Sequence, residues 1–291
     1  MKLSKILLVL FKKGVRLFSG YGVSKFYPVK NIYKFLKREL KNSKGIVEVQ
    51  GHKMLLDSKD SLELSIRGVH EPLETKLVKK EIKEGNVVLN IGAHIGYYTL
   101  IFAKLVGEKG EVFAFEPEPT NFSLLQKNVE INGYKNVVLV QKVVSNKSGK
   151  AKLYLCKDHT GMHRIEYSNG DRKFIEIETI RLDDYFKDYN GKIDFIKMDI
   201  EGAEGGALEG MPLLLEKNKK MKIITEFFPS ALKEFGVEPE EFLKLLTKYG
   251  FKFFAINEKE KKIKPINISE LLKIYTPEKG NATDLLCLRE K

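Results

Sequence analysis

The chain has 291 residues, and 43% of them are hydrophobic, so it can bury a substantial core and disorder throughout is excluded. Its formal net charge is +12, from 51 Lys and Arg against 39 Asp and Glu. The two cysteines, Cys156 and Cys287, lack a short pairing or metal-ligand spacing, so neither a disulfide framework nor a zinc module is indicated and a cytoplasmic location is expected.

Residues 1–44 carry most of the positive charge. They hold twelve Lys and Arg and one acid, Glu39, which gives +11 and leaves the other 247 residues nearly neutral. Apolar residues at helical spacing between these cations predict a basic amphipathic helix in this N-terminal arm. The longest apolar run, residues 6–11, is far shorter than the ~20 residues of a membrane-spanning helix, and no convincing signal cleavage site follows it.

Three interpretations of the arm stay open. Residues 1–20 are suited to lie on an anionic membrane, which would make the protein peripheral at the inner face. The same helix is equally suited to pack on its own domain. Clustered positive charge also attracts nucleic acid, which we consider the least favoured of the three.

From residue 45 to residue 291 we expect one domain, in which strands alternate with helices. The strand candidates are residues 87–91, 111–116, 137–143, 193–199, 221–227, 251–256 and 284–288, and the helical patterns cover about 97–106, 119–132, 203–217 and 230–249. This alternation predicts an α/β, Rossmann-like fold with a doubly wound, mostly parallel, seven-stranded sheet. Residues 150–182 interrupt it with two short alternating runs, which predict an inserted β-hairpin.

The first predicted core strand leads into a glycine loop, VVLNIGAHIGYYTL, over residues 87–100. Gly92 and Gly96 lack β-carbons, so backbone can approach a ligand there, and the following helix offers free N–H groups. The dinucleotide pattern G-x-G-x-x-G requires its second glycine where this chain has His94, so nicotinamide and flavin cofactors are disfavoured. We expect His94 to shape the loop by hydrogen bonding.

The second core strand ends at Glu116, 24 residues beyond Gly92, and Pro117 and Pro119 stiffen the turn that follows. A carboxylate at the tip of this strand can accept two hydrogen bonds from the vicinal hydroxyls of a ribose. The alternative is a surface acid that ends a strand, and the glycine loop beside it makes that interpretation less favoured.

Three motifs follow one another along the chain: NIGAHIGYYTLIFAKLVGEKGEVFAFEPEPTNFSLLQKNVEING, VVSNKSGKAKLYL and IDFIKMDIEGAEGGALEGM. Over about residues 68–228 they resemble the FkbM family of S-adenosylmethionine-dependent methyltransferases. The resemblance implies the class I methyltransferase fold and S-adenosylmethionine as cofactor. It also implies site roles: the cofactor's methionine part faces Gly92, Ala93 and Gly96, its ribose faces Glu116 beside Pro117, its adenine lies near Ser145 and Asn146, and Glu71 helps close the site.

Three positions depart from the family pattern. Asn90 stands where the first strand usually ends in Asp, and Asn146 stands where Asp is frequent. An amide still forms hydrogen bonds at both positions but contributes no charge. Arg181 occupies a place where Thr is common, with no consequence that we can name. These departures bear on cofactor affinity, and they leave a non-catalytic scaffold with a degenerate cofactor site as an alternative.

Methyl transfer from a sulfonium is an in-line displacement, so the protein aligns donor and acceptor and removes a proton. Asp199, Glu201 and Glu204 follow the fourth core strand, and Glu226 ends the fifth. Asp199 and Glu226 are expected at one edge of the sheet, as general base, as hydrogen-bond partner of the acceptor or cofactor, or as ligands of a divalent cation. No tight ligand spacing indicates a metal site, and Glu204 equally suits the start of a helix.

Two histidines in the insertion, His159 and His163, are alternative bases, since an imidazole pKa near 6.5 suits proton transfer at neutral pH. Polar loops also carry histidines without a chemical role. The motif DIEGAE replaces the Asn/Asp-Pro-Pro-aromatic turn of many N-methyltransferases, which favours an oxygen acceptor. The resemblance implies a hydroxyl of a small molecule or glycan, and the arm extends this to lipid-linked sugars. An RNA methyltransferase that uses the arm is the rival enzyme, and oligomeric state is not predicted.

Overall fold

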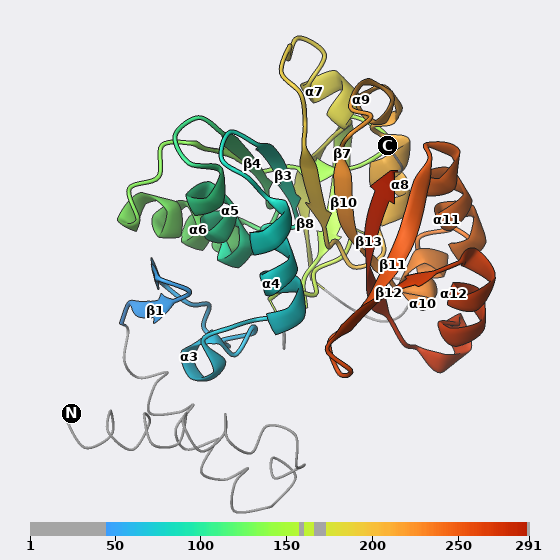
Figure 1. Ribbon diagram of the computed structural model, residues 1–291. Coiled ribbons are helices and arrows are strands. Elements are labelled where there is room, and N and C mark those ends of the chain that lie inside the picture. Colours follow the sequence, from blue (N-terminus) through green and yellow to red (C-terminus); the bar gives the residue numbers. More distant parts are fainter. Residues whose placement is uncertain (1–44, 157–159, 166–172, 290–291) are drawn as a thin grey trace, which may run out of the picture. The chain divides into compact units, whose positions relative to one another are not determined.

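The computed structural model describes residues 45–156, 160–165 and 173–289 (Figure 1). The predicted arm of residues 1–44 and His159 lie outside the described residues. By its contacts the chain divides into two compact units, residues 1–70 and 71–291. The expected boundary at residue 44 stays a prediction. Within the described ranges, no helix combines the length and the apolar character needed to cross a membrane.

The described part of the first unit is a small hairpin followed by one helical turn. Strands β1 (Val47–Val49) and β2 (His52–Met54) pair antiparallel, and α3 (Leu64–Arg67) follows. The hairpin turn consists of Gln50 and Gly51, which both have positive φ angles of 51° and 80°. This left-handed pair is the geometry that two-residue hairpin turns favour.

The second unit is built on an eight-stranded sheet in the order β12-β11-β13-β10-β9-β3-β4-β5. Its strands are β3 (Val87–Ile91), β4 (Glu111–Phe115), β5 (Val137–Val140), β9 (Phe195–Met198), β10 (Lys222–Phe227), β11 (Phe251–Asn257), β12 (Lys262–Ile266) and β13 (Thr283–Arg289). The five strands from β10 to β5 are parallel, whereas β13 is antiparallel to both of its neighbours. The predicted α/β fold with a mostly parallel sheet is therefore confirmed.

The eighth strand, β12, was not predicted. Its sequence, KIKPI, has no apolar run, and its side chains are exposed or half-buried. It lies at the edge of the sheet, where Pro265 is tolerated because one side of the strand needs no backbone donor. Its pairing with β11 creates a hairpin that the hydrophobic pattern does not reveal.

Helices cover the strands (Figure 1). They are α4 (Pro72–Glu81), α5 (Tyr97–Val106), α6 (Pro119–Ile131), α7 (Leu182–Tyr185), α8 (Glu204–Glu209), α9 (Pro212–Lys217), α10 (Pro229–Glu234), α11 (Pro239–Lys248), α12 (Ile268–Ile274) and the 3₁₀ helix η2 (Pro277–Lys279). The helix predicted over 203–217 is two helices, because Pro212 begins a new one after Gly210. The helix predicted over 230–249 is likewise interrupted, by Gly236 at φ 74° and by Pro239.

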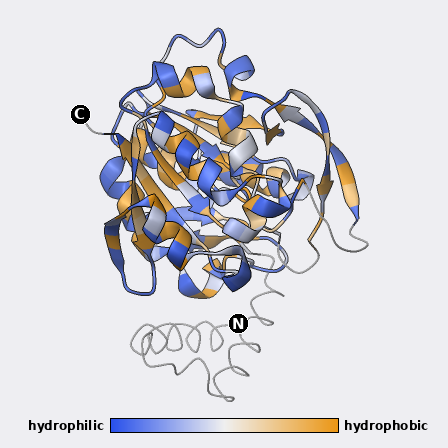
Figure 2. Cartoon of the chain, turned by 90° about the vertical axis from the view of Figure 1, so that its right-hand side faces the viewer, coloured by the Kyte–Doolittle hydropathy of each residue, from blue (hydrophilic) through white to orange (hydrophobic). Residues whose placement is uncertain are grey.

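The core lies between the central strands and these helices. Leu89 on β3, Ile196 on β9 and Ile223 on β10 have no exposed surface. Apolar strands of this kind are typical of parallel sheets with both faces covered. In Figure 2 the central strands are largely orange, and blue residues gather on the helices and loops around them.

The predicted insertion is a separate three-stranded sheet in the order β6-β8-β7. Strands β7 (Gly149–Tyr154) and β8 (Phe174–Ile180) form the expected antiparallel hairpin, and β6 (Val143–Val144) adds to β8 in parallel. Residues 160–165 return toward β7, where the Tyr154 and Arg164 backbones exchange N–H···O bonds of 2.7 and 3.2 Å. We call residues 155–165, as far as they are described, the wall segment.

Candidate active site

A cleft lies at the carboxyl ends of β3, β4 and β9, and holds about 600 Å³ of empty space, part of it open to solvent. Strand β4, which follows β3 in the chain, lies on one side of β3, and β9 lies on its other side. The order of strands in the sheet therefore reverses at β3. Ligands of open α/β sheets bind at such a reversal. The cleft is lined by residues of the glycine loop, the β4 end, the β9 end and the wall segment, among them Gly92, His94, Glu116, Pro117, Asn121, Thr160, His163, Ile165, Asp199 and Glu201.

Both glycines of the loop have positive φ angles, which favour glycine, and Gly92 is also required by the backbone that faces it. At Gly92 (φ 85°) a β-carbon would lie 2.0 Å from the carbonyl oxygen of Asp199, and at Gly96 (φ 96°) it would lie 2.8 Å from Leu125 Cδ1. We expected the bare backbone to make room for a ligand, but the protein itself occupies the space above both glycines. Gly92 still lines the cleft, and its N–H, like that of Ala93, donates to the Phe115 carbonyl at 3.0 and 2.9 Å.

Asn90, the residue that departs from the family's usual Asp, is buried at the end of β3. Its Nδ2 donates to Thr99 Oγ1 of α5 at 2.8 Å. The amide therefore joins the strand to the helix on the far side of the glycine loop. This is the hydrogen bonding that an amide was expected to retain at this position.

Glu116 is 5% exposed and lies at the edge of the cleft beside Pro117. One carboxylate oxygen accepts the N–H of His94 at 2.8 Å, and the other accepts the N–H of Glu118 at 3.0 Å. Burial raises the pKa of Glu116 to about 7 despite these two donors. Each carboxylate oxygen has two lone-pair sites, so both oxygens can still accept a hydroxyl. The geometry fits the predicted contact with a ribose diol.

The wall segment closes against the glycine loop. His94 Nε2 lies 2.8 Å from Thr160 Oγ1, and Asn121 Nδ2 donates to the Thr160 carbonyl at 2.8 Å. The sequence interpretation missed Asn121 and Thr160. Asn121 is buried in the first turn of α6, and its burial, which reveals the need for a specific partner, is visible only in the structure.

Ser145 and Asn146 do not line the cleft, in contrast to Lys142, Val143 and Val144 just before them. The Ser145 N–H donates to the Ile180 carbonyl at 3.0 Å, and Asn146 Nδ2 donates to Glu209 Oε2 of α8 at 2.9 Å. Ser145 thus continues the pairing of β6 with β8, and Asn146 connects the small sheet to α8. The contact of both residues with adenine stays a prediction.

Acidic side chains gather where β9, β10 and β13 meet. Met198 pairs with Thr225, and Glu226 pairs with Asp284, so Asp199, Glu226 and Asp284 follow one another across three neighbouring strands. The sequence predicted the first two together and missed the third. Burial, followed by the charge of Asp199, raises the pKa of Glu226 well above its usual value. Its Oε2 is buried without a hydrogen-bond partner.

A buried ion pair lies beneath this row. Lys197 Nζ is 2.7 Å from Glu74 Oε1 of α4 and 3.8 Å from Asp199 Oδ2, and it lies 4.5 Å above the centre of the Tyr98 ring. The Tyr98 hydroxyl donates to Glu71 Oε2 at 2.9 Å, which connects Glu71 to the same group. The lysine inside the apolar strand IDFIKMD was the overlooked signal, since a buried lysine requires a partner.

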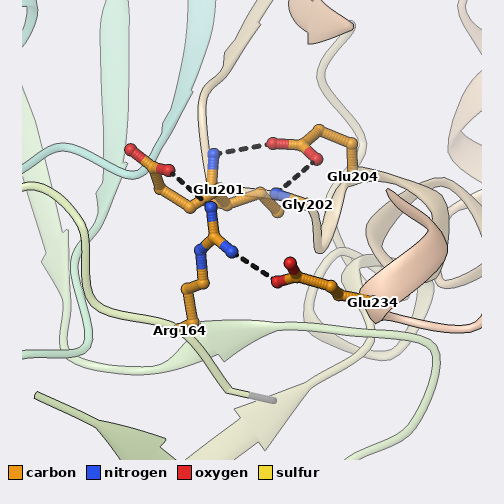
Figure 3. A network of polar contacts seen from close by, with 6 residues as sticks. Arg164, Glu201, Gly202, Glu204 and Glu234 are labelled. Carbon is orange, nitrogen blue, oxygen red and sulfur yellow. Dashed lines mark hydrogen bonds and ion pairs between the residues drawn. The ribbon is translucent and has the colours of Figure 1, made fainter. Parts of the chain in front are cut away.

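The loop after β9 is held by two interactions (Figure 3). Glu204 accepts the N–H groups of Ile200 and Gly202, both at 2.9 Å, so it braces the turn at the start of α8. Arg164 Nη2 lies 3.4 Å from Glu201 Oε2, and its Nη1 lies 2.6 Å from Glu234 Oε2. Burial, with Asp199 as the next cause, raises the pKa of Glu201 to about 7. Burial raises the pKa of Glu204 to about 8.

His163 lines the cleft from the wall segment. Its Nδ1 accepts the N–H of Cys156 at 2.9 Å. A neutral imidazole with this bond carries its proton on Nε2. With its Nδ1 engaged as an acceptor, His163 is less suited to be a base than the sequence suggested.

The acidic groups were also a candidate metal site. Across residues 45–156, 160–165 and 173–289, no three His, Cys, Asp or Glu side chains are arranged to hold a metal ion. The three carboxylates that line the cleft, Glu116, Asp199 and Glu201, fit a different ligand, one that carries positive charge. S-adenosylmethionine has an ammonium group, a sulfonium group and a ribose diol, and the residues of this cleft suit all three.

A sheet with β13 inserted antiparallel beside β10, and a cleft of this kind at the β3 and β4 ends, defines a class I methyltransferase that uses S-adenosylmethionine. The model of the methyltransferase FkbM domain matches residues 90–253, more than half of the chain. The chain belongs to the FkbM methyltransferase family, as its motifs predicted.

Individual relatives are distant. The hexuronic acid methyltransferase AglP of Haloferax volcanii is 27% identical over 59% of this chain and 66% of its own length. Methyltransferase 1 of Beauveria bassiana is 23% identical over 48% of this chain and 68% of its own length. The protein-L-isoaspartate O-methyltransferase of Methanococcoides burtonii is 40% identical, but over 21% of this chain and 30% of its own length. The chain thus spans about two thirds of the length of the Haloferax and Beauveria relatives and under a third of the Methanococcoides relative.

Solved structures resemble the chain at low identity. A SAM-dependent O-methyltransferase from Thermotoga maritima has a TM-score of 0.42 at 14% identity, covering 85% of this chain and 78% of that one. A SAM-dependent methyltransferase from Aquifex aeolicus has a TM-score of 0.41 at 16% identity, covering 75% and 90%. These scores are low, so the class rests on the sheet order and the family match.

Proposed function

We propose that the protein transfers a methyl group from S-adenosylmethionine to a hydroxyl oxygen of a sugar, free or as part of a glycan or lipid-linked saccharide. The observation that carries this proposal is that Glu116 and Glu201 line one cleft, one beside the glycine loop and the other beside the wall segment. The Haloferax relative, whose name specifies a hexuronic acid methyltransferase, supports a sugar acceptor.

The cofactor half of the cleft is formed by the glycine loop and the β4 end. Glu116 would accept the ribose hydroxyls, and Asp199, close to Gly92, would face the positively charged end of the cofactor. When bound, S-adenosylmethionine supplies a methyl group that is already activated by its sulfonium. The protein's part is therefore to align the acceptor and remove its proton.

Among the acids, Glu201 is the best-placed base. It lines the cleft, and its pKa of about 7 is close to the pH at which it would work. Glu204 is engaged by two backbone N–H groups, and Glu226 does not line the cleft. Asp199 lies 3.8 Å from Lys197 Nζ, so a cation already attracts its carboxylate.

The wall segment forms the other side of the acceptor space. Thr160, His163 and Ile165 line the cleft together with Glu201, and they belong to an insertion rather than to the sheet. Ile165 would exclude water from this space. A hydroxyl beside Glu201 would be oriented by the wall segment as well as by the carboxylate.

Transfer of tritiated methyl from S-adenosylmethionine to a set of acceptors tests the proposal. The set contains neutral sugars, hexuronic acids and RNA, each offered to the full-length protein. We expect label on a sugar, stable to mild alkali, because a methyl ether resists alkali and a methyl ester on a uronate carboxyl does not. Alkali-labile label, label on RNA, or no label on any sugar would contradict sugar O-methylation.

A further inference from the structure

Arg164 connects three segments that are distant in the sequence (Figure 3). Its backbone pairs with Tyr154 of β7, and its guanidinium reaches Glu201 after β9 and Glu234 at the end of α10. The side chain is 12% exposed. Its guanidinium carbon lies 6.0 Å from the centre of the Phe228 ring, at the start of α10. A cation enclosed by two carboxylates and an aromatic face is held in one orientation.

The position of Arg164 in the chain gives these contacts a consequence for the cleft. His163 and Ile165, on either side of it, both line the cleft. Because the Arg164 side chain is bound to Glu201 and Glu234, the backbone between His163 and Ile165 is held in place. The wall segment is therefore held against the β9 side at one point and against the glycine loop, through Thr160, at another.

Glu201 needs this support, because its backbone is strained. Its φ of 58° lies in the left-handed region, which costs a residue with a side chain about 1–2 kcal/mol. Glu204 fixes the backbone on both sides by accepting the N–H groups of Ile200 and Gly202. Glu204 does not touch the carboxylate of Glu201. Arg164 supplies that contact, at 3.4 Å.

We propose that Arg164 is a positioning residue for methyl transfer, which holds the Glu201 carboxylate in the cleft and fastens the wall segment across the acceptor space. The inference rests on the proposed function, in which Glu201 takes the acceptor proton. Arg164 acts on the acceptor half alone, since neither Glu116 nor the glycine loop is among its ion-pair partners. Its loss should lower turnover and leave cofactor affinity intact.

Three variants separate this role from a general effect on stability. Arg164→Met removes both ion pairs. Arg164→Lys keeps the positive charge but lacks the planar guanidinium group. Glu234→Gln weakens the ion pair between Arg164 and Glu234 and leaves the contact with Glu201. For each we would measure kcat and acceptor KM, the Kd of S-adenosylmethionine by titration calorimetry, and amide hydrogen exchange over residues 160–165.

We expect Arg164→Met to lower kcat by about 10- to 100-fold, as misplacement of a reacting group does, with Kd for S-adenosylmethionine changed less than about twofold. Exchange over residues 160–165 should quicken in the same variant. Arg164→Lys should recover part of kcat, and Glu234→Gln should stay within about threefold of wild type, because the inner contact remains.

An unchanged kcat in Arg164→Met would overturn the proposal, as would a cofactor affinity that falls as far as kcat. A Glu234→Gln variant as impaired as Arg164→Met would also overturn it, because the contact with Glu201 would then be irrelevant. Hydrogen exchange gives an answer that does not depend on turnover. If the wild type methylates no acceptor, the proposed function fails, and unchanged exchange in Arg164→Met would separately refute the fastening of the wall segment.

Discussion

Lys197 Nζ lies 2.7 Å from Glu74 Oε1, and the two side chains are 3% and 0% exposed. Burying either charge alone would be costly, because ions lose their hydration in the protein interior. Each charge of the pair therefore compensates the other inside the protein. Burial raises the pKa of Glu74 to about 7, and the charge of Glu74 and its acidic neighbours keeps the pKa of Lys197 well above its usual value.

Removal of one partner of this pair should destabilise the protein. Lys197→Met leaves Glu74 buried near the acids Glu71 and Asp284, and we expect the free energy of unfolding to fall by about 3–5 kcal/mol. The double variant Lys197→Met/Glu74→Leu should recover most of that loss, since two apolar side chains leave no buried charge without a partner. Guanidinium unfolding curves measure both values. A single variant within about 1 kcal/mol of wild type would show that the pair has no such role.

The pH dependence of stability follows from the buried carboxyls. Glu74, Glu116 and Glu201 have pKa values raised from 4.5 to about 7, and Glu204 to about 8. Between 4.5 and these values the folded state binds more protons than the unfolded state, so stability falls as pH rises. We expect the free energy of unfolding of the ligand-free protein to decrease from about pH 4.5 to about pH 8.

Urea titrations at fixed ionic strength across this range provide the measurement, and Glu201→Gln provides the comparison. The variant lacks one of the raised carboxyls, so its decline with pH should be shallower than that of the wild type. Stability that rises from pH 5 to pH 8, or equal slopes in the two proteins, would contradict the raised pKa values.

Local patterns in the sequence were enough to predict the strand, the glycine loop and the acid at which the cleft is built. The strand, the glycines and the helix of residues 87–106 are contiguous, and Glu116 stands at the end of the next apolar run. Hydrophobic period and glycine placement determine such units with little help from the rest of the chain. The same holds for the hairpin of β7 and β8, whose alternation is visible in one short segment.

The buried charges next to Asp199 could not be predicted in this way. Glu74, Lys197 and Asp284 come from α4, β9 and β13, and only the order of strands in the sheet brings them together. No local pattern contains that order. The contact of Thr160 with Asn121 and His94 is equally non-local, because an insertion folds back over a loop about 60 residues earlier in the chain.

The close approach of β9 to the glycine loop yields a matched pair of substitutions. Gly92→Ala would place a methyl group 2.0 Å from the Asp199 carbonyl oxygen, whereas Gly133→Ala meets nothing within 4 Å. Both glycines have positive φ, at 85° and 74°. In Gly133→Ala we expect the free energy of unfolding to fall by about 1–2 kcal/mol, because a residue with a β-carbon is strained at positive φ. In Gly92→Ala the loss should be clearly larger, or the protein should not fold. Thermal unfolding compares them, and equal losses would contradict the described packing.

Glu116 should determine cofactor affinity. In Glu116→Gln the side-chain amide would turn an N–H₂ group toward a backbone N–H of His94 or Glu118, and the charge would be lost. We expect the Kd of S-adenosylmethionine to rise by about 10-fold or more, which corresponds to the loss of a hydrogen bond to a charged group. Glu130→Gln, on the exposed side of α6, is the control and should bind as the wild type does. Equal affinities of all three proteins would remove Glu116 from the site.

A crystal structure of the full-length protein with S-adenosylhomocysteine tests the central claim most directly. The cleft at the ends of β3 and β4 should contain the ligand, with its ribose hydroxyls about 2.5–3.0 Å from the Glu116 carboxylate. The amino-acid end should lie toward Asp199. Ligand density at another place, or a ribose that makes no contact with Glu116, would contradict the account.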